Sequence, residues 1–216
     1  MLQFVLFLVA MVIIIIITLF VVKLRKTTQE EWEKFKQKQE RETALLKSVT
    51  DVDRGDWAER KTVLTLLNLG LKPTAIFHDL YVKVGEGRYS QIDLVVATKV
   101  GILVFEIKDY SGWIFGKGSQ SYWTQVLAYG EEKHRFYNPI KQNIDHIKVL
   151  NKAINYKYKI NSLIVFASNN FDNDKLDNVI NLNDFESYII NFKNDYTLSK
   201  DEIDNIFMMI KDYANR

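Results

Sequence analysis

The sequence predicts a mixed α/β domain in which helices cover a sheet, preceded by one N-terminal transmembrane helix. Residues 4–22 are apolar except for Thr18, which is typical of a membrane span. Further along, apolar runs of strand length alternate with segments of helical periodicity. Of the 216 residues, 47% are hydrophobic and 13% aromatic, which is enough for one domain with a sizeable core.

The predicted membrane anchor covers residues 1–26. At 1.5 Å per residue, the apolar stretch nearly matches a hydrocarbon core of about 30 Å. The start of the chain lacks the positive flank, short apolar region and small-residue cleavage site of a secretory signal. Lys23, Arg25 and Lys26 follow at once, and the positive-inside rule keeps them in the cytoplasm. We therefore expect a single-pass protein of the cell membrane with a cytoplasmic body, although a buried core helix is the alternative interpretation.

Residues 27–54 form a charged juxtamembrane helix or linker in this prediction. They are rich in Glu, Lys, Gln and Arg, which favour helices, and Thr28 and Glu31 have the spacing of a capping box. A coiled coil that oligomerises at the membrane is a further possibility, but no sustained heptad of apolar residues is found. Residues 23–50 carry eight basic and five acidic side chains, so the rest of the +2 chain sums to −1 and is not a broadly basic nucleic-acid binder.

The elements of the body follow from apolar periodicity and from turn and cap signals. Residues 55–168 form the predicted core, and residues 169–216 its C-terminal helical extension. Asn138-Pro139 begins a helix whose apolar stripe is Ile140, Ile144, Ile147, Leu150 and Ile154. The other predicted elements are a helix over 56–69, a strand over 76–84, a hairpin of 90–97 and 102–108, strands over 121–129 and 161–167, and a capped helix over 199–213.

The composition limits the kinds of metal site. The chain has no cysteine, which excludes disulfides, thiolate zinc sites and cysteine nucleophiles. It has three histidines, and none has a partner at metal-ligand spacing. Any metal would then take oxygen ligands, and Mg²⁺ or Mn²⁺ are the ions that prefer them.

The predicted hairpin brings charged side chains into apolar strands. If its turn is centred on Lys99 and Val100, Asp93 lies opposite Glu106 and shares its face. Lys108 points the same way, being two residues further on. The other face, which includes Ile92-Leu94-Val96 and Leu103-Phe105-Ile107, is wholly apolar. Two such carboxylates would repel each other unless a cation lay between them, so the pattern predicts a metal site.

Two further residues extend this site. Glu59 lies on the apolar stripe of its helix with Val63 and Leu66, and could bring a third carboxylate to the hairpin. Gln142, one turn into its helix, could contact a phosphate or the attacking water. The set suits metal-assisted phosphodiester hydrolysis, in which Asp93, Glu106 and Glu59 bind the metal and Lys108 stabilises the oxyanion. Phosphate contacts could come from five basic residues: Arg88, Lys117, Lys133, Arg135 and Lys141.

Each piece also has a structural interpretation. Glu-x-Lys is commonly a surface pair, Asp93 could cap a turn, Glu59 could pair with Arg60 or Lys61, and Gln142 is by itself an ordinary helix-surface residue. The metal-site prediction depends on their conjunction on one face of a strand pair.

The chain resembles the nuclease-related domain (NERD) family, which is grouped with the PD-(D/E)XK nuclease superfamily. The resemblance covers roughly residues 55–167. Its motifs are Gly55 with Glu59, Gln91-Ile92-Asp93, Gly101-Ile102 leading into Val104-Phe105-Glu106-Ile107-Lys108, Gly112-Trp113-Ile114, Trp123, and Asn138-Pro139-Ile140 with Gln142. It implies a restriction-endonuclease-like mixed sheet flanked by helices. It also implies Asp93 and Glu106 as metal ligands, Lys108 as the catalytic lysine, Glu59 as the helix-borne acid and Gln142 as a supporting residue.

Besides a structural role with an oligomerising stalk helix, the sequence is compatible with two functions. The first is a membrane-anchored, magnesium- or manganese-dependent nuclease that hydrolyses DNA on the cytoplasmic side. The second is a non-catalytic module with a nuclease-like fold that binds nucleic acid or a protein partner at the membrane. The near-neutral body favours the module, and the intact set of acids and lysine favours the enzyme.

Overall fold

The computed structural model describes residues 2–51, 53–167, 170–171, 176, 178–192 and 197–214. The description is limited to the backbone for residues 2–10, 12–15, 170–171 and 214. By its internal contacts the chain divides into two compact units, Met1–Ala44 and Leu45–Arg216. Helix α1 (Leu2–Lys47) begins in the first unit and ends in the second.

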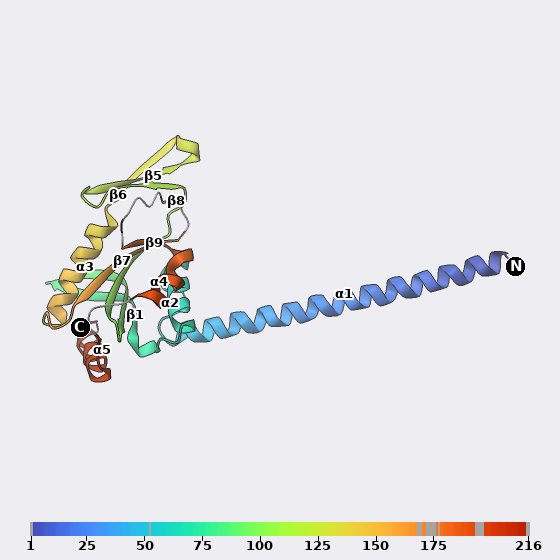
Figure 1. Ribbon diagram of the computed structural model, residues 1–216, viewed down its shortest axis with the longest axis horizontal. Coiled ribbons are helices and arrows are strands. Elements are labelled where there is room, and N and C mark those ends of the chain that lie inside the picture. Colours follow the sequence, from blue (N-terminus) through green and yellow to red (C-terminus); the bar gives the residue numbers. More distant parts are fainter. Residues whose placement is uncertain are drawn as a thin grey trace. The chain divides into compact units, whose positions relative to one another are not determined.

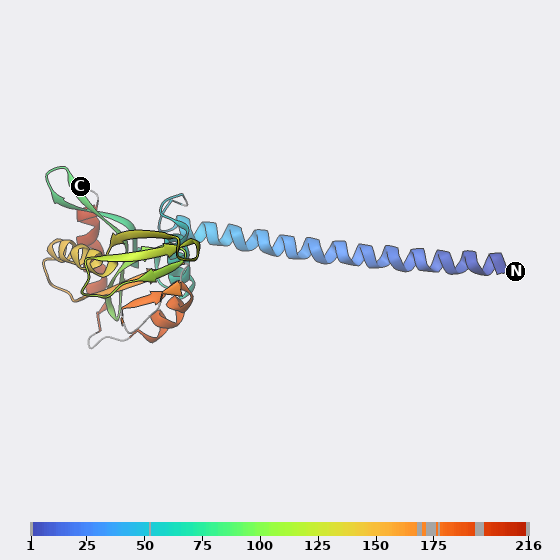
Figure 2. The ribbon, with the colours of Figure 1, turned by 90° about the horizontal axis from the view of Figure 1, so that it is seen from above.

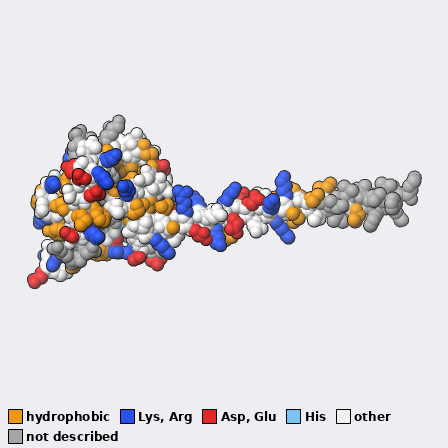
Figure 3. Space-filling view, turned by 90° about the horizontal axis from the view of Figure 1, so that it is seen from below, with side chains coloured by type: hydrophobic (Ala, Val, Ile, Leu, Met, Phe, Trp, Pro, Cys, Tyr) orange, Lys and Arg blue, Asp and Glu red, His pale blue; other side chains and the backbone are white. Residues whose placement is uncertain are grey.

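Helix α1 is continuous where a helix start was predicted. The Thr28 hydroxyl donates to the Leu24 carbonyl instead of capping an N-terminus, so the capping-box prediction was wrong. Basic and acidic side chains are interspersed along the charged part of α1 (Figure 3). Within the described part of the chain, no helix is both long and apolar enough to cross a membrane. Most side chains of the predicted span, those of residues 4–10 and 12–15, lie outside the described part.

The second unit is built on a five-stranded mixed sheet with the order β1-β2-β3-β7-β9 (Figure 1). The strands β1 (Ile76–Gly85), β2 (Arg88–Thr98) and β3 (Gly101–Lys108) are antiparallel neighbours, whereas β7 (Ile160–Phe166) and β9 (Val179–Asn181) continue the sheet in parallel. The predicted α/β class with a mixed sheet is therefore confirmed. Strand β3 is buried along almost its whole length, as expected for a central strand.

Helices cover both faces of this sheet (Figure 2). On one face, α2 (Trp57–Asn68) and α4 (Phe185–Asn191) pack on Leu94, Val96 and Phe105. On the other face, α3 (Pro139–Ala153) and α5 (Lys200–Ala214) pack on Val95 and Val104. The capping box predicted at the start of the last helix is confirmed, since Glu202 accepts from the backbone N–H of Ser199 and Ser199 Oγ accepts from the N–H of Glu202.

Strands β1 and β2 both change faces at an acidic residue. Asp79 has φ +52°, and the register of the two strands places it across from Asp93. Leu94 packs on the α2 side, but Ile92 packs on the α3 side, although a regular strand would turn both the same way. The prediction that Ile92, Leu94 and Val96 share one face was therefore wrong. The irregularity lies where the acidic side chains enter the sheet.

A second sheet of four strands has the order β6-β5-β4-β8. Its strands are β4 (Trp113–Phe115), β5 (Tyr122–Leu127), β6 (Glu132–Tyr137) and β8 (Asn170–Phe171). Its inner face packs on the main sheet through Trp123, whose ring stacks on Phe166 with the centroids 6.1 Å apart. Short 3₁₀ turns occupy Pro73–Ala75, Ala128–Gly130 and Leu182–Asp184.

Asn138 joins this second sheet to α3. Its side chain caps the helix by accepting from the N–H of Ile140, and its amide donates to the carbonyls of Lys117, Gly118 and Gln120. The residue is fully buried. One side chain therefore holds the start of α3 and the β4–β5 loop together.

Candidate active site

The hairpin has the predicted register. Leu94 pairs with Phe105 and Thr98 with Gly101, so the turn is centred on Lys99 and Val100. The ladder ends at Leu94 and Phe105, one position short of Asp93 and Glu106. Asp93 Oδ2 accepts a 2.8 Å hydrogen bond from the backbone N–H of Ile107, the residue between Glu106 and Lys108. The two strands thus bring both carboxylates to one place, as the sequence predicts.

Glu106 is fully buried and contacts two cationic or potentially cationic groups. Its Oε1 lies 2.5 Å from Lys108 Nζ, and its Oε2 lies 3.2 Å from Nε2 of His146 on α3. The angles of both contacts are poor for hydrogen bonds, so Lys108 and His146 contact the two Glu106 oxygens without satisfying them by well-aligned hydrogen bonds. Burying a carboxylate in this way is costly, because it gives up its bonds to water. The carboxylate has capacity left for a further ligand.

Burial and the charge of Glu106 raise the pKa of Asp93 to about 8, and Glu59 makes a smaller contribution in the same direction. The hydrogen bond from Ile107 and the charge of Lys108 lower this pKa, but by less. Burial alone would lower the pKa of Lys108, but the charge and close contact of Glu106, together with Asp93, raise it. Lys108 is therefore a cation at neutral pH, whereas Asp93 is largely protonated there. A bound cation would favour the ionised form of Asp93.

Glu59 enters the site from the first turn of α2. Asp56 caps this helix by accepting from the N–H of Glu59. Glu59 Oε2 lies 3.0 Å from His78 Nε2 on β1, and His78 Nδ1 lies 2.9 Å from Thr50 Oγ1. Because Glu59 contributes to the raised pKa of Asp93, it lies within electrostatic reach of the hairpin. The predicted partner of Glu59 was a metal or a neighbouring base, whereas the structure gives it a buried histidine.

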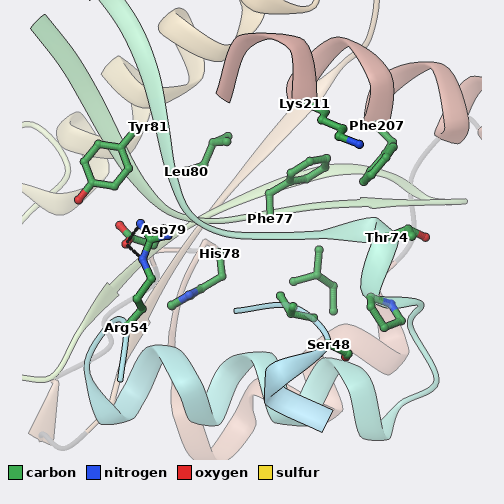
Figure 4. Close-up of a pocket in the computed structure, with 13 residues that line it drawn as sticks. Ser48, Arg54, Thr74, Phe77, His78, Asp79, Leu80, Tyr81, Phe207 and Lys211 are labelled. Atoms are coloured by element: carbon green, nitrogen blue, oxygen red, sulfur yellow. Dashed lines mark hydrogen bonds and ion pairs between the residues drawn. The ribbon is translucent and has the colours of Figure 1, made fainter. Parts of the chain in front are cut away.

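A second ion pair lies on β1 next to this histidine. Arg54 Nε donates to Asp79 Oδ2 over 2.8 Å, and Gln91 donates to the other oxygen over 2.7 Å. Both Arg54 and Asp79 line a cavity of about 440 Å³ that His78 also borders, and Figure 4 shows the pair side by side there. The rest of the lining comes from the turn after α1, the turn before β1, β1 itself and α5. Asp79 is thus paired with Arg54, as Glu106 is paired with Lys108.

Helix α3 presents polar side chains to the sheet where an apolar stripe was predicted. Ile144 is 43% exposed, while Asn143 and His146 are buried. Asn143 donates to the Val104 carbonyl and to Ser162 Oγ. The buried residues of α3 recur at helical spacing and are Pro139, Asn143, His146, Leu150 and Ala153. The inward face is therefore rotated about the helix axis relative to the predicted one. Gln142 is half-buried next to this face, and no contact places it at the carboxylates.

Sequence reasoning missed His146 as a site residue. Its Nε2 contacts Glu106, and its Nδ1 lies 3.0 Å from Ser90 Oγ. The available signal was its spacing of three from Asn143 and four from Leu150, which places it on the buried face of α3. A histidine held between a hydroxyl and a carboxylate is well placed to orient that carboxylate.

The carboxylates are suited to a divalent cation, but they do not enclose one. Across the described residues, no three His, Cys, Asp or Glu side chains group closely enough to hold a metal ion by themselves. Mg²⁺ is commonly bound by one or two carboxylates while it keeps several waters. The unsatisfied Glu106 oxygens and the neighbouring Asp93 fit that mode of binding.

Comparison with known proteins agrees with the predicted resemblance. The model of the nuclease-related domain family matches residues 54–167, which include every predicted site residue. An uncharacterized protein of Bacillus anthracis is 29% identical over 164 residues, which cover 73% of this chain and 75% of that protein. No solved structure matches the chain.

Proposed function

Since the chain belongs to the nuclease-related domain family, within the PD-(D/E)XK-like nuclease superfamily, we propose a hydrolytic function for it. In this proposal the protein hydrolyses phosphodiester bonds of DNA with the help of Mg²⁺ or Mn²⁺. The observation that carries the proposal is the fully buried Glu106 carboxylate, which is paired with Lys108 and lies beside a second acid, Asp93, with its oxygens not satisfied by well-aligned hydrogen bonds. An ordinary structural ion pair would not need a second acid with a raised pKa next to it. Family membership suggests a nuclease-like function, and this arrangement supports the hydrolytic version of it.

Asp93 and Glu106 would hold the cation, with Glu59 nearby. When bound, such an ion neutralises charge on the phosphate and lowers the pKa of a water molecule. Lys108 contributes a fixed positive charge at the same place, where it stabilises the charge that grows on the phosphate oxygens. His146 and the Ile107 N–H hold the two carboxylates in position. Gln142, at the start of α3, would contact substrate from the side.

Cleavage by the full chain in detergent micelles tests this function. With Mn²⁺ present, the wild-type protein should cleave linear, plasmid or single-stranded DNA, and Lys108→Ala should lose nearly all of that activity. Lys99→Ala is the matched control, because Lys99 is an exposed lysine at the far end of the same hairpin. Equal activity in the two variants, or no cleavage of any of these substrates with either metal, would contradict the proposal.

We further propose that the protein is anchored in the cell membrane by residues 4–22 and that its body is cytoplasmic. The support is the apolar composition of that stretch and the three basic residues directly after it. Carbonate-resistant membrane fractionation of the full chain, together with protease accessibility of the body in intact cells, tests both parts. Release of the chain by carbonate would contradict the anchor, and digestion in intact cells would contradict the orientation.

The alternative function is a non-catalytic module that binds nucleic acid or a protein partner at the membrane. The favouring observation is the net charge of −1 outside residues 23–50, which is unusual for an enzyme that must attract a polyanion. Calorimetry with Mn²⁺ separates the two functions. Binding that is lost in Asp93→Ala supports the enzyme, and absence of binding to the wild-type chain supports the module.

A further inference from the structure

The outer face of the second sheet carries exposed aromatic side chains. Directly paired residues share a face, and so do alternate residues of one strand. By the pairings of β4, β5 and β6, one face consists of Trp113, Phe115, Tyr122, Tyr137, Lys133 and Arg135, with Thr124 and Val126 between them. We call the four rings and two basic residues the aromatic platform.

The rings of the platform are not part of a core. Trp113 is 52% exposed, Phe115 50%, Tyr122 51% and Tyr137 42%. The core of this sheet lies on the opposite face, where Ile114 and Trp123 are buried. Single exposed aromatic residues are ordinary, but four on one small sheet face are a reason to expect a ligand.

The charges of the platform identify the chemistry of that ligand. Lys133 and Arg135 are exposed on the same face as the rings, and the Arg135 guanidinium lies 5.0 Å from the centre of the Tyr122 ring. The acidic residue of β6, Glu132, pairs with Leu127 and so belongs to the opposite face. Among the described side chains of this face there are flat rings, two cations and no carboxylate, which suits a polyanion that has exposed π-faces.

We propose that the aromatic platform binds an unpaired segment of a nucleic acid by stacking its bases on the exposed rings. This inference deepens the proposed nuclease function, and the part of the platform in catalysis rests on that function. In a duplex, neighbouring base pairs cover each base face, so stacking on protein rings requires unpaired bases. Base–aromatic stacking is sequence-tolerant, and basic residues beside the rings hold the backbone.

The platform is joined to the candidate active site at both ends. Trp113 follows Lys108 by five positions, and Tyr137 is followed directly by Asn138, the cap of the helix that carries His146. The packing of Trp123 on Phe166 fixes the second sheet to the main one. Nucleotides held on the platform would therefore lie on the same rigid unit as the carboxylates.

Binding is best measured on the otherwise wild-type full chain in EDTA, so that metal-dependent cleavage does not interfere. Fluorescence anisotropy in detergent micelles would compare a labelled oligo(dT), an oligo(rU) of equal length and a duplex. We expect a single strand to bind at least about tenfold more tightly than the duplex, since only it offers free base faces. The deoxy and ribo probes show which sugar the platform accepts.

Trp113→Ala and Tyr122→Ala should each weaken single-strand binding about five- to hundredfold, whereas Trp113→Phe, which keeps a ring, should stay within about threefold of the parent. Tyr156→Ala is the matched control, since Tyr156 is 67% exposed and lies outside the platform. Thermal unfolding of each variant identifies any loss of fold. Equal binding by single strand and duplex, or platform variants that bind like Tyr156→Ala, would overturn the inference.

The two proposals fail in different ways. If cleavage depends on Lys108 but the platform variants bind single strands normally, the nuclease stands and the platform inference is wrong. If single-strand binding depends on the platform but no metal-dependent cleavage occurs, the platform stands as a binding surface and the hydrolytic function is wrong.

Discussion

Asp93 is tied to the backbone N–H of Ile107, so the residue that separates Glu106 from Lys108 also fixes their position relative to the first acid. This bond crosses from β2 to β3 at the point where the regular pairing of the two strands ends. The hairpin therefore delivers three ionisable groups to one place by backbone geometry.

The metal-free protein should lose stability as the pH rises from about 4 to about 8. The pKa of Asp93 is near 3.8 in the unfolded chain and about 8 in the folded one, so the folded state binds the extra proton across this range. Each pH unit then removes up to about 1.4 kcal/mol of unfolding free energy from this group. Thermal unfolding with EDTA at pH 5, 7 and 9 measures the trend. Asp93→Asn should flatten it, and an equally steep decline in that variant would be inconsistent with the assignment.

Binding of Mn²⁺ at pH 7 should release about one proton, because the cation favours the ionised form of Asp93. At pH 9 the carboxyl has already lost its proton, since its pKa is about 8, and the release should nearly vanish. Calorimetric titrations in two buffers of different ionisation enthalpy give the number of protons. Asp93→Asn serves as the control, and a release that persists in this variant would show that another group titrates.

Lys108→Ala should destabilise the protein by about 3–5 kcal/mol, because it leaves the buried Glu106 carboxylate without its cation. The double variant Lys108→Ala/Glu106→Gln removes the uncompensated charge and should recover part of the loss. Urea unfolding of both single variants and the double variant completes the thermodynamic cycle. Additive effects would mean that the two side chains do not interact, contrary to the 2.5 Å contact.

His146→Phe should weaken Mn²⁺ binding about 10- to 100-fold by removing a group that orients Glu106. His146→Gln keeps polar atoms in the position and should recover part of the affinity. The matched control is His134→Gln, which changes an exposed histidine on β6. If calorimetry gives the same affinity for His146→Phe and His134→Gln, His146 plays no positioning role.

Gly55→Ala should lower both stability and activity. The added Cβ would lie 2.2 Å from Glu59 Oε2 and 2.7 Å from His78 Nε2, and Gly55 has φ +71°. Gly70 provides a clean comparison, since it has φ +88° with nothing within 4 Å of a Cβ. Gly70→Ala should therefore cost only the backbone strain of about 1–2 kcal/mol, without affecting activity. Unfolding and cleavage assays of both variants separate strain from displacement of Glu59, and matching losses in the two would argue against the displacement.

The hairpin was predictable because its register follows from one local feature. Once Lys99 and Val100 form the turn, the period of two fixes every pair up to Leu94 and Phe105, the neighbours of Asp93 and Glu106. The position of Glu59 was equally local, since helical periodicity alone places it on the inward side of α2. These residues carry most of the proposed chemistry.

The remaining site residues depend on contacts between distant parts of the chain. His146 meets Glu106 and His78 meets Glu59 only after α3 and β1 have docked, and no short-range pattern specifies either contact. The face change at Asp79 was also hidden, because a positive φ is uncommon for aspartate in a strand. Strand β6 was missed although Gly130 marks the turn before it, because its residues are mostly charged and exposed and show no apolar alternation.

The four hydrogen bonds of Asn138 leave the start of α3 no freedom to shift against the β4–β5 loop. A nucleic-acid strand bound on the aromatic platform could therefore not shift α3 along β3, and so could not change the positions of the carboxylates. A substrate of a different shape would then have to bend to reach the carboxylates. We therefore expect stiff substrates to be turned over more slowly than flexible ones.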